Sequence, residues 1–163
     1  MHDIADLVAL FRERASTLVL YARQWLPRER AEDVVQDVFA KLIERRQRVP
    51  GIAWLYRCVR NAAISELRST RSRLQREQRI AGERSDWFDA SPDALIDAAR
   101  AAELIEQLPA AQREALVLRI WSGLGFAEIA DVMNISTSTA FAHCQSALAE
   151  LKKRLEKPCP TKT

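Results

Sequence analysis

Hydrophobic residues recur along this chain at intervals of three and four positions, the spacing that places them on one side of an α-helix. The alternation of polar and apolar residues that marks a half-buried strand is not evident anywhere. Proline and glycine, which are costly inside helices, fall between the periodic stretches. The pattern therefore predicts an all-α protein. Its helices are expected near residues 4–25, 28–48, 52–81, 93–107, 110–121, 126–133 and 137–156.

A polar segment with several turn formers, residues 82–92, interrupts this pattern and is the predicted linker. Its last two residues and the one that follows, Ser91-Pro92-Asp93, are typical of a helix start: a cap, a first-turn proline and an acid near the positive helix end. Two small helical domains joined by a flexible linker follow from this division. The expected parts are a three-helix unit over 1–81, a four-helix unit over 93–157 and a disordered tail over 158–163.

The second predicted helix has two different faces. Its apolar stripe is formed by Ala31, Val34, Val35, Val38 and Leu42. Its outward side chains are mainly acidic: Asp33, Gln36, Asp37 and Glu44. Such a patch is either a solvated surface or the contact for a basic helix of a partner.

The third predicted helix carries polar side chains that a core does not explain. Its core side is formed by Ile52, Leu55, Val59 and Ala63. The opposite face carries Trp54, Arg57, Asn61, Ser65 and Arg68, with Arg71 and Arg73 just beyond. Rings stack on bases, amides read base edges and guanidiniums contact phosphates, so this face suits single-stranded or distorted nucleic acid. The alternative is a solvated Arg-rich helix with Trp54 tucked against a neighbouring loop.

Residues 126–140 have the pattern of a helix-turn-helix. Ala130 supplies the small residue where two helices cross, and Asn134 tolerates the positive φ that the turn requires. Residues 136–139 offer caps for the second helix, and Ala140 packs back on the first. The segment therefore predicts a helix-turn-helix. Because two helices and a turn are a common arrangement, the pattern alone is a moderately specific signal.

The second helix of this motif is unusual for DNA recognition. Its predicted apolar face contains Ala140, Cys144, Ala147, Leu148, Leu151 and Leu155, and its outward face contains Thr139, Ala142, His143 and Ser146. It carries no Lys or Arg before Lys152, so attraction to phosphates is weak. Ser, Thr, His or Gln side chains could still contact bases, although His143 could equally be an inert exposed residue. Cys144 is interpreted as a core thiol, and Cys58 is also expected to be buried.

Charge and composition narrow the function further. The formal net charge of +3 is uninformative, but residues 57–84 hold eight Arg and three acids, whereas residues 86–106 hold six acids and one Arg. The basic block indicates an anionic partner. Three widely spaced cysteines suit a reduced cytoplasm, and two histidines allow no zinc spacing. We expect no membrane span, signal peptide, metal site, phosphate loop or nucleophile–base pair, and hence not an enzyme.

Three segments together resemble one protein family. Residues 31–39 (AEDVVQDVF) resemble the polymerase-binding segment of bacterial sigma factors, and residues 53–63 (AWLYRCVRNAA) resemble their promoter −10 segment. Residues 108–115 (LPAAQREA) with 123–130 (GLGFAEIA) resemble their −35-binding domain. The chain thus resembles an extracytoplasmic-function (ECF) sigma factor of the sigma-70 family, with only regions 2 and 4, over nearly all of residues 5–156.

The resemblance implies roles for individual residues. The surface that docks on core RNA polymerase would include Asp33, Gln36, Asp37 and Phe39, with a core position as the alternative for Phe39. The −10 element would face Trp54, Arg57, Asn61, Ser65 and Arg68, with Asn61 near a flipped base and Arg71 and Arg73 on the backbone. The −35 element would face Ser136, Thr137, Ser138, Thr139, Phe141, Ala142, His143, Gln145 and Ser146.

The expected function is that of a promoter-specificity subunit, which binds core RNA polymerase and promoter DNA in the cytoplasm, starts promoter melting and needs no cofactor of its own. An anti-sigma partner is implied by the resemblance. The sequence departs from the family pattern in two places. The connection over residues 46–52 is short, and relatives often carry Lys or Arg where this chain has Phe141, His143, Gln145 and Ser146. Two alternatives remain, a stand-alone helix-turn-helix regulator and a helical protein that sequesters a partner without binding DNA.

Overall fold

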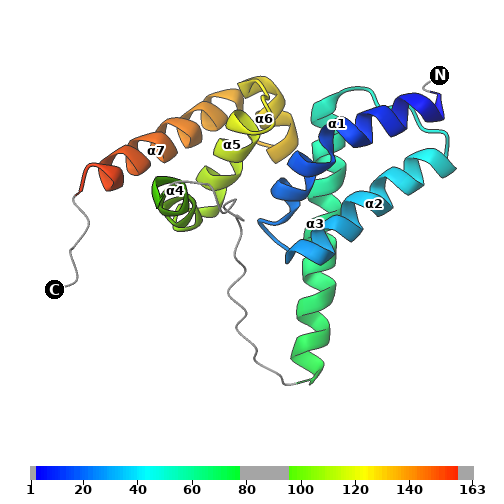
Figure 1. The fold of residues 1–163 in the computed structure, drawn as a ribbon, viewed down its shortest axis with the longest axis horizontal. Helices are drawn as coiled ribbons and strands as arrows, with labels where there is room; N and C mark the ends of the chain where they lie inside the picture. Colours follow the sequence, from blue (N-terminus) through cyan, green and yellow to red (C-terminus); the bar gives the residue numbers. More distant parts are fainter. Residues whose placement is uncertain (1–2, 78–95, 158–163) are drawn as a thin grey trace. The chain divides into compact units, whose positions relative to one another are not determined.

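The computed structural model describes residues 3–77 and 96–157, and every regular element within these ranges is an α-helix (Figure 1). The predicted all-α class is confirmed. The chain divides into two compact units, with α1–α3 in the first and α4, α5, α7 and most of α6 in the second. The helices are α1 (Ile4–Ala22), α2 (Arg28–Glu44), α3 (Ile52–Glu77), α4 (Ile96–Glu106), α5 (Ala110–Ile120), α6 (Phe126–Met133) and α7 (Thr137–Leu155).

The predicted linker, the cap signal Ser91-Pro92-Asp93 and the predicted tail lie outside the described residues. The domain boundaries therefore stay predictions. Among the described helices, none is both long and apolar enough to cross a bilayer.

The helix α2 ends four residues earlier than predicted because its last turn closes in a Schellman motif. The amide of Gln47 donates to the carbonyl of Leu42 at 2.9 Å, and the amide of Arg46 donates to the carbonyl of Ile43 at 3.1 Å. This arrangement requires one residue in the left-handed backbone conformation. Arg46 adopts that conformation, with φ 48°. A non-glycine residue there costs about 1–2 kcal/mol. The helix α1 also ends earlier, at Ala22 rather than near residue 25.

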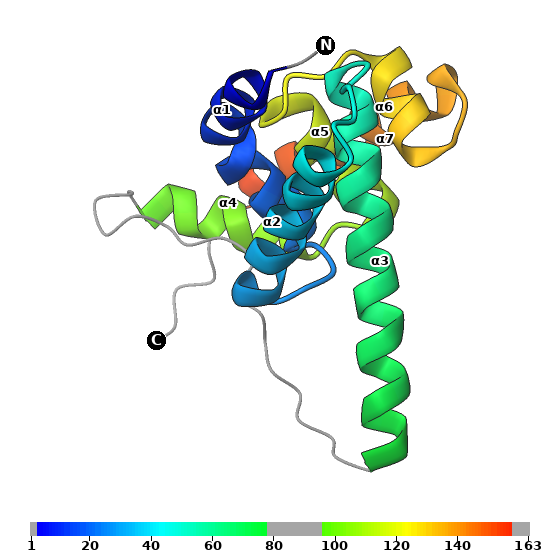
Figure 2. The same ribbon diagram turned by 90° about the vertical axis from the view of Figure 1, so that its right-hand side faces the viewer.

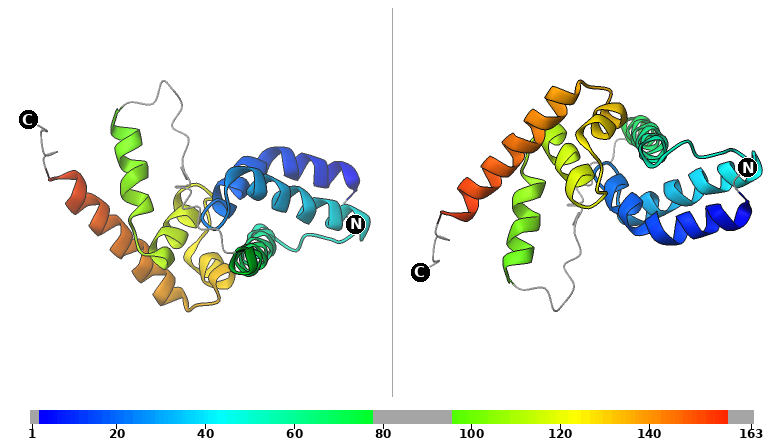
Figure 3. Two further views of the ribbon diagram at one scale, coloured as in Figure 1. Left: turned by 90° about the horizontal axis from the view of Figure 1, so that it is seen from below. Right: turned by 90° about the horizontal axis from the view of Figure 1, so that it is seen from above.

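The three helices of the first unit surround an apolar core with an aromatic centre. In Figure 3, α1 and α2 lie side by side while α3 is seen nearly end-on. The rings of Tyr21 and Tyr56 meet edge-to-face with centroids 5.4 Å apart. The Tyr56 hydroxyl lies 2.9 Å from the Thr17 hydroxyl oxygen, to which it donates. The predicted core stripe of α3 did not include Tyr56, which is fully buried.

Only the first half of α3 belongs to this core. Leu55, Val59 and Ala63 are fully buried, as predicted, whereas Ile52, the first residue of the helix, is half-buried. The second half extends beyond α1 and α2 (Figures 1 and 2), and residues 71–76 are exposed. An ion pair of 2.8 Å between Arg30 and Glu66 joins α2 to α3 near the point where the core ends.

In the second unit α7 packs against α5 and α4. Its buried face is centred on Ala140, Cys144 and Ala147. The guanidinium of Arg100 on α4 donates to the carbonyls of Arg154 and Lys157 at 3.3 and 2.9 Å. Since the last carbonyls of a helix have no partner within it, this side chain both caps α7 and fixes α4 on it.

Candidate nucleic-acid interface

The polar face of α3 is exposed as predicted. Arg57, Asn61, Ser65 and Arg68 are all exposed, and Arg71 and Arg73 continue the series on the part of the helix that extends from the core. The two sides of this helix therefore have different roles. Apolar residues on one side attach it to α1 and α2, and polar residues on the other side stay free of the core.

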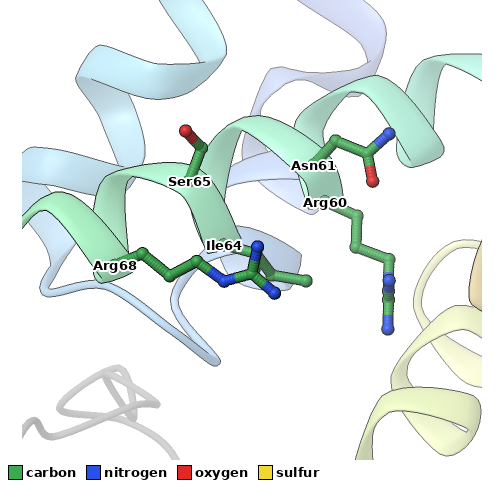
Figure 4. Close-up of a pocket in the computed structure, with 5 residues that line it drawn as sticks. All are labelled: Arg60, Asn61, Ile64, Ser65 and Arg68. Atoms are coloured by element: carbon green, nitrogen blue, oxygen red, sulfur yellow. The ribbon is translucent and has the colours of Figure 1, made fainter.

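A pocket lies on this face of α3. It is lined by Arg60, Asn61, Ile64, Ser65 and Arg68 (Figure 4). The lining therefore contains two guanidiniums, an amide, a hydroxyl and one apolar side chain. Guanidiniums bind phosphates, while an amide and a hydroxyl can hydrogen-bond to a base edge, so the pocket suits a nucleotide removed from its stack.

Two of these residues, Arg60 and Ile64, were missed by the sequence analysis. Arg60 lies 5.9 Å above the centroid of the Trp25 ring, a cation–π arrangement that holds its guanidinium beside the pocket. The Trp25 ring in turn meets Tyr21 edge-to-face at 5.1 Å. The spacing of Arg60, Ile64 and Arg68, four residues apart, was the signal that could have found them.

Trp54 differs from the rest of the predicted face because it is half-buried. Only part of its ring is available to stack on a base. Cys58 is also half-buried rather than buried as predicted. Burial raises the pKa of its thiol and outweighs the opposite effect of the Arg57 guanidinium, so the thiol stays protonated near neutral pH.

The outward face of α2 is a second exposed polar surface. Asp33, Gln36, Asp37 and Glu44 are exposed, as the pattern predicted. The structure decides between the two positions left open for Phe39. Its side chain is only 4% exposed, and its ring meets that of Phe11 edge-to-face at 5.1 Å. Phe39 therefore belongs to the core and leaves the outward surface to its polar neighbours.

The geometry predicted for the helix-turn-helix is confirmed. Asn134 ends α6 with φ 56°, and the amide of Ile135 donates to the carbonyl of Ala130 at 3.0 Å. Ala130 on α6 and Ala140 on α7 are both buried. Ser136 caps α7, since its Oγ accepts the amide of Thr139 at 3.1 Å.

The side chains predicted to face the −35 element are not equally accessible. Most of them are exposed: Ser136, Thr137, Ser138, Phe141, Ala142, Gln145 and Ser146. Thr139 and His143 are half-buried. Cys144 is buried as predicted, and burial raises the pKa of its thiol against the smaller opposite effect of Arg119.

The predicted apolar face of α7 needs a correction. Leu148 and Leu155 were assigned to the core, but their side chains are 46% and 48% exposed. Each residue advances about 100° around a helix, so Leu148 is rotated away from the buried Ala147. Leu155, seven residues further, lies on the same exposed line.

An aromatic pair joins the two helices of the motif at the start of α7. Phe141 meets Phe126 edge-to-face with centroids 5.2 Å apart. The guanidinium of Arg119 lies 4.6 Å from the centroid of the Phe126 ring and donates to the carbonyl of Leu124 at 2.9 Å. The sequence carries no local signal for this arrangement, because its three side chains come from three helices.

Comparison with known proteins finds two family models that match this chain. Sigma-70 region 2 matches residues 10–73, which include α2 and most of α3. Sigma-70, region 4 matches residues 98–151, which include the helix-turn-helix. The two matches together account for well over half of the chain. The chain belongs to the sigma-70 family.

Relatives within that family include sigma factors of the ECF group. The chain is 29% identical to the ECF RNA polymerase sigma factor SigL of Mycobacterium tuberculosis, over 94% of this chain and 91% of the relative. It is 29% identical to the RNA polymerase sigma-H factor of Pseudomonas aeruginosa, over 78% and 74% of the two chains.

Two solved structures share the fold. The sigma factor RpoE of Bartonella quintana, solved with the anti-sigma factor NepR, has a TM-score of 0.71 at 23% identity over 93% of this chain and 99% of that one. CnrH, solved with the cytosolic domain of CnrY, has a TM-score of 0.64 at 23% identity over 94% and 90%.

The family assignment makes this chain a promoter-specificity subunit of RNA polymerase, as the resemblance implied. It belongs to a family of regulatory subunits rather than of enzymes. A stand-alone regulator and a sequestering protein without DNA binding are not favoured, because both sigma-70 regions match in one chain.

Proposed function

We propose that this sigma factor divides its work among three helices: the outward face of α2 binds core RNA polymerase, α3 binds and melts the −10 element, and α7 reads the −35 element. The observation that carries this proposal is the exposed polar face of α3, with Arg57, Asn61, Ser65 and Arg68. No packing requirement within the unit explains these side chains. We propose the boundaries 1–81 for the first domain and 93–157 for the second.

On α2 the docking surface consists of Asp33, Gln36 and Asp37. All three are exposed, and neither carboxylate pairs with a cation in the described part of the chain. A row of unpaired acids on a rigid helix suits a basic helix of a large partner, and it disfavours contact with DNA through like charge. This face therefore fits polymerase, in agreement with the acidic pattern of the sequence.

The pocket on α3 offers contacts that would favour melting of the promoter duplex. Extruding a base from a duplex costs a few kcal/mol. Asn61 and Ser65 can offset part of this cost by hydrogen bonds to the extruded base, and Arg60 and Arg68 by contacts to its flanking phosphates. The half-exposed ring of Trp54 supplies a stacking surface near the start of the helix. These contacts are available only to an opened strand, so they favour the melted promoter over the duplex.

On α7 the exposed side chains are nearly neutral, so the contact to the −35 element is weak by itself. Polymerase would hold the two units at the spacing of the two promoter elements. Two modest DNA contacts within one complex with polymerase then give a higher overall affinity, because the second binding event becomes intramolecular. The free subunit is accordingly expected to bind promoters poorly. Its site of action would be the cytoplasm, with polymerase, and an anti-sigma protein is the expected regulator.

Transcription from a promoter library with purified core polymerase tests this function. We expect initiation at one shared pair of upstream elements, and only when the protein is added. The double variant Asn61→Ala, Arg68→Ala should lose open complexes and keep polymerase binding. Absence of promoter-specific initiation at every salt concentration would contradict the proposal. Tight binding of duplex DNA without polymerase would instead favour a stand-alone regulator.

A further inference from the structure

Two of the polar side chains at the start of α7 are already bonded within the helix cap. The hydroxyls of Ser136 and Thr139 lie 2.7 Å apart, and the Ser136 oxygen also accepts the Thr139 amide, so both are engaged in the helix cap. The sequence has no Lys or Arg from Thr137 to Leu151. A recognition helix of this composition must obtain sequence preference from something other than cationic contacts.

The most exposed large side chain near the start of this helix is that of Phe141, at 48%. Its ring is held edge-to-face on Phe126, which lies under the guanidinium of Arg119, and that guanidinium is itself fixed on the carbonyl of Leu124. Three helices thus brace one exposed ring. A ring held in this way loses little freedom when it makes a contact, which favours binding.

We propose that Phe141 reads the C5 methyl group of a thymine in the major groove of the −35 element. The inference rests on the proposed function of α7. Residues in the first turns of a recognition helix reach base edges, and Phe141 lies in the second turn. Among the four bases only thymine presents a methyl group in that groove, and an apolar side chain recognises it by contact.

A different role for this ring would be docking of a protein helix. Phe141, Leu148 and Leu155 are spaced by seven residues and are all about half exposed, so they form an apolar line along α7. Within the described part of the chain, Phe141 is the one member of this line whose side chain packs on an aromatic ring. It alone lies near the end of the helix that would enter the groove. DNA contact therefore explains Phe141 better, while Leu148 provides a matched control for the apolar line.

The experiment replaces one thymine at a time by deoxyuridine in the upstream element selected from the promoter library. This change removes a methyl group and leaves every hydrogen-bonding group in place. Affinity of the reconstituted holoenzyme is measured for the wild type, Phe141→Ala, Phe141→Leu and Leu148→Ala. At one thymine we expect deoxyuridine to weaken promoter binding by the wild type about fourfold, which is the effect of losing the burial of one methyl group.

Phe141→Ala should bind the thymine and deoxyuridine promoters equally, whereas Leu148→Ala should keep the wild-type difference. Phe141→Leu, which retains an apolar side chain, should keep part of it, and thermal unfolding verifies that each variant is folded. If no thymine is sensitive in the wild type, or if Phe141→Ala keeps the full difference, the inference is wrong. Weaker polymerase binding by Phe141→Ala with an unchanged thymine preference would favour protein docking. A holoenzyme indifferent to the whole upstream element would refute the proposed −35 role as well.

Discussion

Single substitutions on α3 should separate the attraction of DNA from its recognition. Arg68 and Asn61 are both exposed on the same face of the helix, seven residues apart. Arg68 forms no ion pair with any other described residue. Replacing either by alanine should change stability by no more than about 0.5 kcal/mol, as is usual for surface positions. Any larger effect on promoter opening then reports a lost contact with DNA.

The two variants should differ in their dependence on salt. Arg68→Ala removes one phosphate contact, so the slope of log affinity against log salt should become shallower by about 0.7 to 0.9. Asn61→Ala removes hydrogen bonds to a base and no charge. It should leave the slope unchanged and weaken the open complex by about 1–3 kcal/mol, a factor of about 5 to 150.

Open-complex formation by the reconstituted holoenzyme, followed between about 50 and 200 mM salt, measures both quantities. Arg12→Ala is the matched control, since Arg12 is exposed on α1 and has no proposed role. Its slope should equal that of the wild type. A changed slope for Asn61→Ala, or an unchanged slope for Arg68→Ala, would refute the roles proposed for these residues. Loss of polymerase binding by either variant would place the docking surface on α3 instead of α2.

Three further predictions concern docking and stability. Asp37→Arg on α2 should weaken binding to core polymerase without changing thermal unfolding, as a pull-down beside a melting curve will show. Tyr56→Phe should lower the free energy of unfolding by about 1 kcal/mol in urea titration, because it removes the buried hydroxyl that donates to Thr17. Arg46→Gly should raise the free energy of unfolding by about 1 kcal/mol, because φ is 48° there and glycine adopts a positive φ without strain. Arg45→Gly, at φ −83°, should not raise it.

Periodicity predicted the helices and most of their buried faces because burial on a helix follows a fixed repeat. The stripe of Leu55, Val59 and Ala63 and the small residues Ala130 and Ala140 are buried as the pattern required. The exposed polar face of α3 could be read in the same way. Polar residues at helical spacing predict an exposed face even when the binding partner is not known.

The residues that were misassigned depend on contacts between helices. Tyr56 is buried because Tyr21 and Thr17 come from another helix to meet it, and periodicity within α3 does not contain that information. Leu148 was assigned to the core because it is apolar, yet α4 and α5 leave its side of α7 exposed. The position of Phe39 stayed open in the sequence for the same reason, until its contact with Phe11 decided it.

The distribution of charge over the two helices proposed to bind DNA, α3 and α7, has a consequence for promoter binding as a whole. Of these two helices, α3 carries exposed arginines, while the exposed face at the start of α7 is neutral and partly apolar. Release of counterions from DNA depends on neutralised phosphates, whereas contact with a methyl group does not. Salt should therefore weaken the −10 contact much more than the −35 contact. At high salt the upstream element should contribute a larger share of the remaining promoter preference, because the contact made by α7 has little charge to lose.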